Sequence, residues 1–354
     1  MTDEKQNEVS ESKEIPHEIN SISDLSRILQ TLGEPEKGHT RFFRGHGDEG
    51  WQMLPSIYRE NYLIKNEDKI IKDALTYCPD DFSPSDTLFE KLVKLQHYGY
   101  STRLLDLTTN ALVALYFSAW NKDHHDKNGE LIILDIPNEE IKYGDSDTVA
   151  ILSAISLRKF PFYIFELIEQ AYGVGNLAKN EFKKKEKEKY CPSEEEYNFC
   201  TDGERSAWNS LIDLYKEQLE LVGKEAFLSS FNSDADIISL LHDIQTDKPS
   251  FRPVINPDDL QRVLCVRAKL NNARISRQQG CFLLFGINDD KLKPAAIPDE
   301  WQRLASNRQK ILVKAENKSA IMEELKSFGI SKRTLFPELE AQATEIMNHY
   351  KGQK

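Results

Sequence analysis

Polar and charged side chains interrupt three apolar stretches of this sequence, and their types suit ligand binding and acid–base chemistry. They are Arg44, Gly45 and His46 in RFFRGHG (41–47); Gln96, His97, Arg103, Asp106 and Thr108 in QHYGYSTRLLDLTT (96–109); and Gln278 and Gln279 in RQQG (277–280). Charges in apolar surroundings must be paired or serve a function. Because so many of them cluster in three motifs, we expect one shared concave site.

The arginines of these motifs favour recognition of an anion. The guanidinium groups of Arg44 and Arg103 can bind phosphate through two parallel hydrogen bonds, and Gly45 lets a ligand approach the backbone. A helix that begins near Asn110 would add free backbone N–H groups. The sequence therefore predicts a small phosphorylated ligand or nucleotide as partner. The residues expected to bind it are Arg44, Gly45, His46, Arg103 and Thr108.

Three further residues are candidates for catalysis. Asp106 or His97 would be the acid–base group, and Gln279 would orient the ligand. A purely structural interpretation remains open, in which Asp106 caps a helix or pairs with an arginine and His97 bonds a carbonyl. Phosphodiester hydrolysis with His46 or His97 as acid–base group is another alternative.

No spacing in the chain is typical of a metal site. Asp106 is isolated, and no HExxH pair or paired aspartates accompany it. The cluster DHHD at 123–126 lies in a polar turn, which favours a solvated loop. We therefore predict no metal.

Composition limits the possible partners and the compartment. The net charge of −12 and pI near 5.3 make extended nucleic acid an unlikely partner. No apolar run reaches the ~18–20 residues that span a bilayer, so no membrane contact is expected. Five scattered cysteines without a CxxC pair indicate a reducing, cytoplasmic environment.

Hydrophobic periodicity predicts the elements that position these motifs. Helices are expected at 21–33, 86–98 and 110–120, and strands at 40–45, 129–137, 262–270, 280–287 and 310–317. The helix at 110–120 is apolar on every side, which predicts burial. This order indicates a mixed α/β (α+β) fold: one small mixed sheet packed by helices, with a largely helical insertion.

Charge and pattern divide the chain into four segments. Residues 1–20 are expected to be an acidic disordered tail, 21–137 the first part of the core, 138–255 the helical insertion, and 256–354 the second part of the core with C-terminal helices. The insertion includes a mixed-charge run at 179–197, typical of a solvated surface. It is a candidate surface for a protein partner.

The motifs FFRGH (42–46), QHYGYSTRLLDLTTNALVALYFSAW (96–120) and ARISRQQGCFLLFG (273–286), with LKSFGISKRTLFPEL (325–339), resemble the FRG-domain family, named for its Phe-Arg-Gly motif. The resemblance covers roughly residues 25–340. Leu107 and Tyr100-Ser101 depart from residues common in the family. The resemblance implies a bacterial or phage-associated protein, and a role in stress or anti-phage defence.

FFRG also resembles the first motif of ADP-ribosyltransferases, whose arginine holds the phosphates of NAD. Ser101–Arg103 is weakly similar to their second motif, but RQQGCFLL lacks their catalytic glutamate. Asp106 would then have to replace that carboxylate, with NAD as the cofactor. The alternatives are a non-catalytic sensor or interaction module, and a nuclease.

Overall fold

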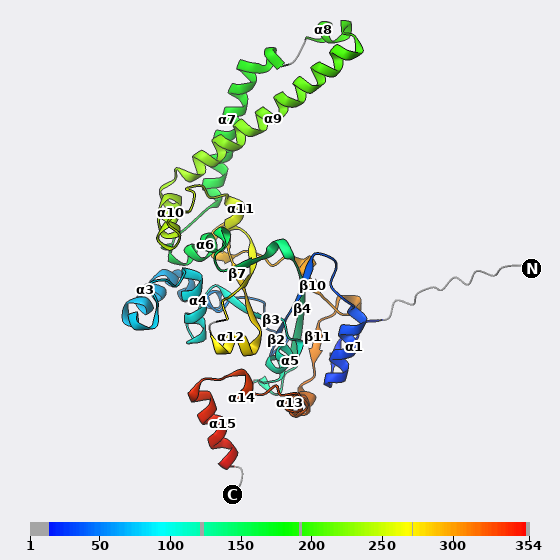
Figure 1. The fold of residues 1–354 in the computed structure, drawn as a ribbon, viewed down its shortest axis with the longest axis vertical. Coiled ribbons are helices and arrows are strands. Elements are labelled where there is room, and N and C mark those ends of the chain that lie inside the picture. Colours follow the sequence, from blue (N-terminus) through cyan, green and yellow to red (C-terminus); the bar gives the residue numbers. More distant parts are fainter. Residues whose placement is uncertain (1–13, 121–123, 191–192, 271, 352–354) are drawn as a thin grey trace, which may run out of the picture.

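The structure is a computed structural model that describes residues 14–120, 124–190, 193–270 and 272–351. Within these ranges, nine strands form the main sheet in the order β1-β11-β4-β2-β3-β7-β6-β5, with β10 paired to β4. Helices cover the sheet, and a long helical hairpin projects from it (Figure 1). The predicted mixed α/β fold with a long helical region is confirmed.

The elements have the following bounds. The strands are β1 Glu18–Ile19, β2 His39–His46, β3 Leu104–Thr108, β4 Gly129–Pro137, β5 Ile141–Tyr143, β6 Val263–Arg267, β7 Gly280–Phe285, β8 Ile287–Asn288, β9 Asp290–Pro294, β10 Gln302–Arg303 and β11 Ile311–Val313. The helices are α1 Ile22–Leu32, α2 Asn61–Lys65, α3 Glu67–Tyr77, α4 Leu88–His97, α5 Ala111–Ala119, α6 Asp147–Ala154, α7 Phe165–Tyr190, α8 Glu194–Phe199, α9 Asp202–Asn232, α10 Ala235–Asp247, α11 Pro257–Leu260, α12 Ala273–Gln278, α13 Lys318–Ser327, α14 Lys332–Leu335 and α15 Leu339–Lys351.

The centre of the sheet is the antiparallel pair of β2 and β4, which is in register along all of β2. Alternate side chains point to opposite faces of a strand. Phe43 and its partner Ile133 therefore pack under α5, while Phe42 and its partner Leu134 belong to a separate cluster on the other face. Both faces of β4 are buried, which explains its continuous apolar sequence.

Helix α5 lies directly on β2. It is buried as its all-apolar sequence predicts, and the side chain of Asn110 caps it by accepting a hydrogen bond from the Leu112 N–H. The backbones of α5 and β2 come close together because the β2 residue at their contact is a glycine. A Cβ on Gly45 would lie 2.0 Å from the Ala114 carbonyl O. The glycine of the Phe-Arg-Gly motif is therefore required for helix packing. Its predicted role in admitting a ligand stays a prediction.

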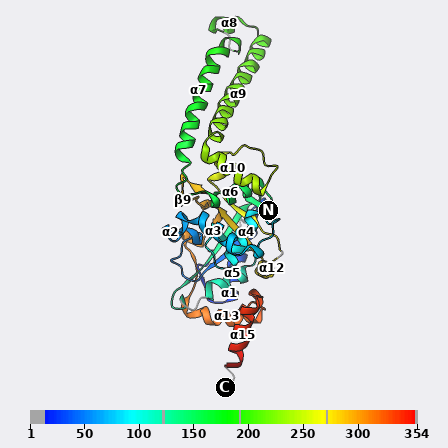
Figure 2. The same cartoon turned by 90° about the vertical axis from the view of Figure 1, so that its left-hand side faces the viewer.

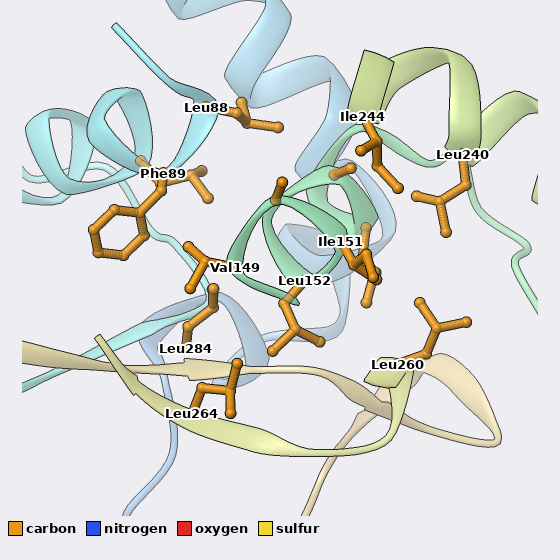
Figure 3. Close-up of a cluster of buried hydrophobic side chains, with 14 of the residues drawn as sticks. Leu88, Phe89, Val149, Ile151, Leu152, Leu240, Ile244, Leu260, Leu264 and Leu284 are labelled. Atoms are coloured by element: carbon orange, nitrogen blue, oxygen red, sulfur yellow. The ribbon is translucent and has the colours of Figure 1, made fainter. Parts of the chain in front are cut away.

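The largest hydrophobic cluster fills the space between the sheet and helices α4, α6 and α10. Figure 3 shows Phe89 of α4, Val149 and Leu152 of α6, and Leu264 and Leu284 of the sheet converging there. This core positions β3, which carries Asp106 and Thr108, and β7, which directly follows Gln278 and Gln279.

Helices α7 and α9 form an antiparallel hairpin that extends away from the sheet (Figures 1 and 2). They lie within 138–255, the segment predicted as a helical insertion. That segment also contains β5, which joins the main sheet beside β6. Residues 1–13 of the predicted tail lie outside the described residues, but β1, at its end, pairs with β11. The segment boundaries stay a prediction.

Replacing Gly45 by Ala should destabilise the fold. The new methyl group overlaps the α5 backbone, and overpacking costs about 1–3 kcal/mol of the free energy of unfolding. Gly203→Ala in α9 is the matched control, because a Cβ there meets no atom within 4 Å. Urea unfolding followed by circular dichroism measures both variants. Equal stability of the two would show that the contact between β2 and α5 is not tight.

Candidate functional site

A cavity of about 210 Å³ lies where β2 and β3 separate, below α5. It brings together the first two sequence motifs and the end of α12. The residues that line it are Phe43, Arg44, Gly45, Trp51, Asp106, Leu107, Thr108, Val113, Ala114, Phe117, Trp120 and Gln278.

The cavity exists because β2 and β3 pair at one position, Phe43 with Thr108. Beyond it, the Arg44 side chain takes the place of backbone pairing. Its Nη1 donates a hydrogen bond of 2.6 Å to the Asp106 carbonyl O. The guanidinium thus joins the two strands while keeping them apart.

The second bond of Arg44 orients its guanidinium. Nε donates to Nε2 of His46 at 3.0 Å. Among the described residues, none accepts a hydrogen bond from Nη2 of Arg44. Burial lowers the pKa of Arg44 to about 10, with Asp106 opposing this shift. The group therefore stays charged at neutral pH and retains an N–H edge for a ligand.

The ring of His46 accepts a hydrogen bond from Arg44 and thereby fixes the position of its guanidinium. The His46 side chain is 1% exposed, and burial, followed by the charge of Arg44, lowers its pKa to about 3. The ring is neutral at physiological pH. Because Nε2 accepts the bond from Arg44, the proton lies on Nδ1, 3.9 Å from the Glu130 carboxylate. His46 is a positioning residue and does not line the cavity.

Asp106 offers a carboxylate at the cavity. Its side chain is exposed, and its Oδ2 accepts a 2.9 Å hydrogen bond from Nε2 of Gln96. Gln96 is held in turn by the Thr102 hydroxyl. Among the described residues, no cation forms an ion pair with Asp106. This arrangement differs from the structural interpretation in which Asp106 pairs with Arg103 or Arg44.

The structure places Arg103 away from the cavity, which corrects its predicted role in ligand binding. Its side chain is 0% exposed, and its Nε donates to the Glu67 carboxylate at 2.9 Å. Nη1 donates to the carbonyl O of Phe285, and Lys291 lies 3.2 Å from the same carboxylate. The physical reason is that Glu67, a buried carboxylate on α3, requires cations.

His97 also lies outside the cavity lining. Its Nδ1 is 3.1 Å from Nδ2 of Asn272, and its ring packs against Phe282. Burial and then Arg274 lower its pKa, while Asp106 opposes the shift. These contacts place His97 near Asp106 but without direct access to a ligand in the cavity.

Hydrogen bonds at Thr108 and Gln279 join the end of β3 to the segment that precedes β7. The Thr108 hydroxyl donates to the Gln278 carbonyl O at 2.7 Å, and the Gln279 carbonyl O accepts from the Thr109 N–H. Gln279 ends α12 in a left-handed conformation, at φ 48°. It lines a separate cavity of about 830 Å³ instead of this one. Gln278, which the sequence analysis did not assign to catalysis or binding, lines the site.

Aromatic side chains were missed by sequence reasoning, although they make much of the cavity wall. Phe117 lies on α5, and Trp120 follows three residues later as the residue that ends this helix, a spacing that puts both side chains on one side of it. Trp51 completes the wall, and its ring lies 5.9 Å from that of His46. Behind the wall, Phe336 stacks on Trp120 at 5.6 Å between ring centres.

The described residues include no group of three or more His, Cys, Asp or Glu side chains placed to hold a metal ion. Of the DHHD cluster, Asp123 lies outside the described residues, and His124 approaches Asp48 at 3.7 Å. No helix among the described residues has the length and apolar character needed to cross a membrane.

Residues 39–127 match the family model of the FRG domain. The matched segment contains β2, β3 and α5, and so includes Arg44, Asp106 and Trp120. Gln278 lies beyond it. Neither the curated proteins nor the solved structures gave a match. The FRG domain predicted from the motifs is thereby confirmed for residues 39–127.

Substituting Arg103 should test its structural role. Arg103→Met leaves the Glu67 carboxylate buried with Lys291 alone, and breaking a buried pair costs about 3–5 kcal/mol of the free energy of unfolding. Arg262→Met is the control, because Arg262 forms half-exposed pairs with Glu140 and Asp259 and should cost at most about 1 kcal/mol. Equal losses in chemical denaturation would contradict the assignment.

The low pKa of His46 predicts a pH dependence of stability. In the unfolded chain a histidine titrates near its ordinary value of about 6.5, whereas in the folded protein His46 titrates at about 3. The unfolded state therefore binds the proton first as the pH falls. As the pH falls from about 6.5 to about 3, the free energy of unfolding of wild type should decrease relative to that of His46→Gln, by up to about 1.4 kcal/mol per pH unit. Parallel stability curves from urea unfolding at several pH values would refute this.

Proposed function

Starting from the FRG domain at residues 39–127, we propose that this chain binds a small nucleotide in the cavity between β2 and β3. One observation carries the proposal: a charged Arg44 with a free N–H edge stands beside the exposed Asp106 carboxylate at an aromatic-lined cavity. The ligand's flat ring would lie inside, and its phosphate would bind to Arg44.

The cavity suits a ring. Trp51, Phe117 and Trp120 offer aromatic faces and edges, on which bases and related heterocycles stack favourably. Its volume of about 210 Å³ is below the usual ~300–1,000 Å³ of whole-ligand pockets. Only part of a nucleotide would therefore be enclosed, and its phosphate would lie at the mouth.

Arg44 favours phosphate over a neutral group. One of its nitrogens is committed to the Asp106 carbonyl and another to His46, so the direction of the fork is fixed before a ligand arrives. Preorganised donors bind without a large entropic cost. The free Nη2 would donate to a phosphate oxygen as a charge-assisted hydrogen bond.

Asp106 supports a reaction in addition to binding. A carboxylate near the sugar would stabilise the positive charge that develops when an N-glycosidic bond breaks. With NAD as substrate, the bond from the ribose carbon to nicotinamide would break, and its electron pair would leave with the ring. A water or another nucleophile would then form the new bond to that carbon and release a proton. Asp106 would take the role of the glutamate that ADP-ribosyltransferases use.

The setting that we propose follows from the family alone. It is a bacterial, cytoplasmic protein that acts in stress or anti-phage defence. A non-catalytic sensor or interaction module is the second candidate, with the α7–α9 hairpin as a separate surface for a protein partner. A nuclease is less well supported, since neither His46 nor His97 lines the cavity.

Incubating the full chain with NAD, with chromatographic detection of nicotinamide, tests this function. Asp106→Asn should lower turnover at least about 100-fold while NAD binding, measured by calorimetry, changes little. Arg44→Lys should weaken binding, because lysine cannot reproduce the fork. Arg27→Lys on the exposed face of α1 and Asp213→Asn on α9 are the controls, and each variant's melting temperature is recorded.

The outcomes separate the two candidates. Binding that depends on Arg44 without any nicotinamide release would support the sensor and exclude NAD cleavage. Failure of wild type to bind NAD or any other nucleotide would refute the proposed ligand. Release that survives Asp106→Asn unchanged would refute the role of Asp106.

A further inference from the structure

The α7–α9 hairpin is the part of the molecule that the proposed site does not use. It projects beyond the sheet and its helices in both views (Figures 1 and 2). The two helices contact each other along one line. Gly175 lies close to Gly223, where a Cβ would come within 2.8 Å of the Gly223 carbonyl O, and Phe182 stacks on Tyr215 with ring centres 5.8 Å apart.

A second apolar stripe runs along the outside of the hairpin. On α9 it comprises Leu211, Leu214 and Leu221, and on α7 Val174 and Leu177. These side chains are between 38% and 65% exposed. The spacings of three and seven residues keep the members of each stripe on one helix face.

Both stripes lie on the same side of the hairpin. Val174 comes one position before the contact residue Gly175, and Leu214 comes one position before the contact residue Tyr215. Because the helices run antiparallel, the same offset on both puts the two stripes side by side. The result is one exposed face with apolar side chains from both helices, and exposed apolar patches mark interaction surfaces.

The face carries unpaired charges of opposite sign on its two helices. Lys184 follows Leu177 by seven residues on α7, and Glu217 lies between Leu214 and Leu221 on α9. Both are exposed, and neither forms an ion pair with a described residue. Since Phe182 is opposite Tyr215, the two charges lie within about one helical turn of the same height.

This pattern is self-complementary, and we propose that the face binds a second copy of this chain. A two-fold axis parallel to the hairpin would place α7 of each copy on α9 of the other at the same height. Each Lys184 would then meet Glu217 of the other copy, and the leucines would become the core of a four-helix bundle. The proposal is independent of the nucleotide site.

Sedimentation velocity of the full chain, from low micromolar to the highest soluble concentration, tests it. Wild type should form a dimer. Leu214→Glu combined with Leu221→Glu should be monomeric over the same range, with an unchanged helical circular dichroism spectrum. Leu270→Glu is the control: Leu270 is as exposed as the hairpin leucines but lies outside the hairpin, so this variant should remain dimeric.

A charge exchange tests the arrangement without touching the apolar residues. Lys184→Glu should raise the dissociation constant of the dimer about tenfold, because two attractive pairs become repulsive. Adding Glu217→Lys should restore wild-type affinity. A wild type that stays monomeric throughout, or a dimer that tolerates both leucine substitutions, would overturn the proposal. A dimer insensitive to Lys184→Glu would overturn the parallel pairing of the hairpins.

Discussion

The bond from the Arg44 guanidinium to the Asp106 carbonyl determines the shape of the candidate site. Strands β2 and β3 pair at one position and then separate, so a β3 carbonyl would otherwise lack a partner. A backbone carbonyl needs a hydrogen-bond partner, and the arginine satisfies this one from within the gap. The same side chain thereby opens a cavity and presents a cationic edge to it.

Neighbouring contacts make this arrangement rigid. Neutral His46 accepts the Nε hydrogen bond, and Gly45 lets α5 rest on β2 as the cavity roof. At the other end of β3, Arg103 is fixed to Glu67 and to the Phe285 carbonyl. The two arginines of the motifs thus have different roles: Arg103 anchors the strand, and Arg44 joins it to β2 while keeping a free edge for a ligand.

Local patterns in the sequence predicted much of the fold and part of the site. The apolar runs around Phe43 and at 129–137 specify strands, and the all-apolar run before Trp120 specifies a buried helix. The choice of partners could not be predicted, because Glu67 lies on an ordinary helix far from Arg103 in sequence. Trp120 was missed for a similar reason: an aromatic residue in an apolar helix has the pattern of core packing, and only the separation of the strands exposes it to a cavity.

The most direct test of the central claim is tryptophan fluorescence during titration with NAD. In a Trp208→Phe background, the remaining tryptophans are Trp51 and Trp120 at the cavity and the buried Trp301. A ring that stacks in the cavity should quench the emission saturably, and Arg44→Lys should shift the quenching to higher NAD concentrations while the protein stays folded. Emission that does not change with NAD, or quenching that persists unchanged in Arg44→Lys, would contradict the account.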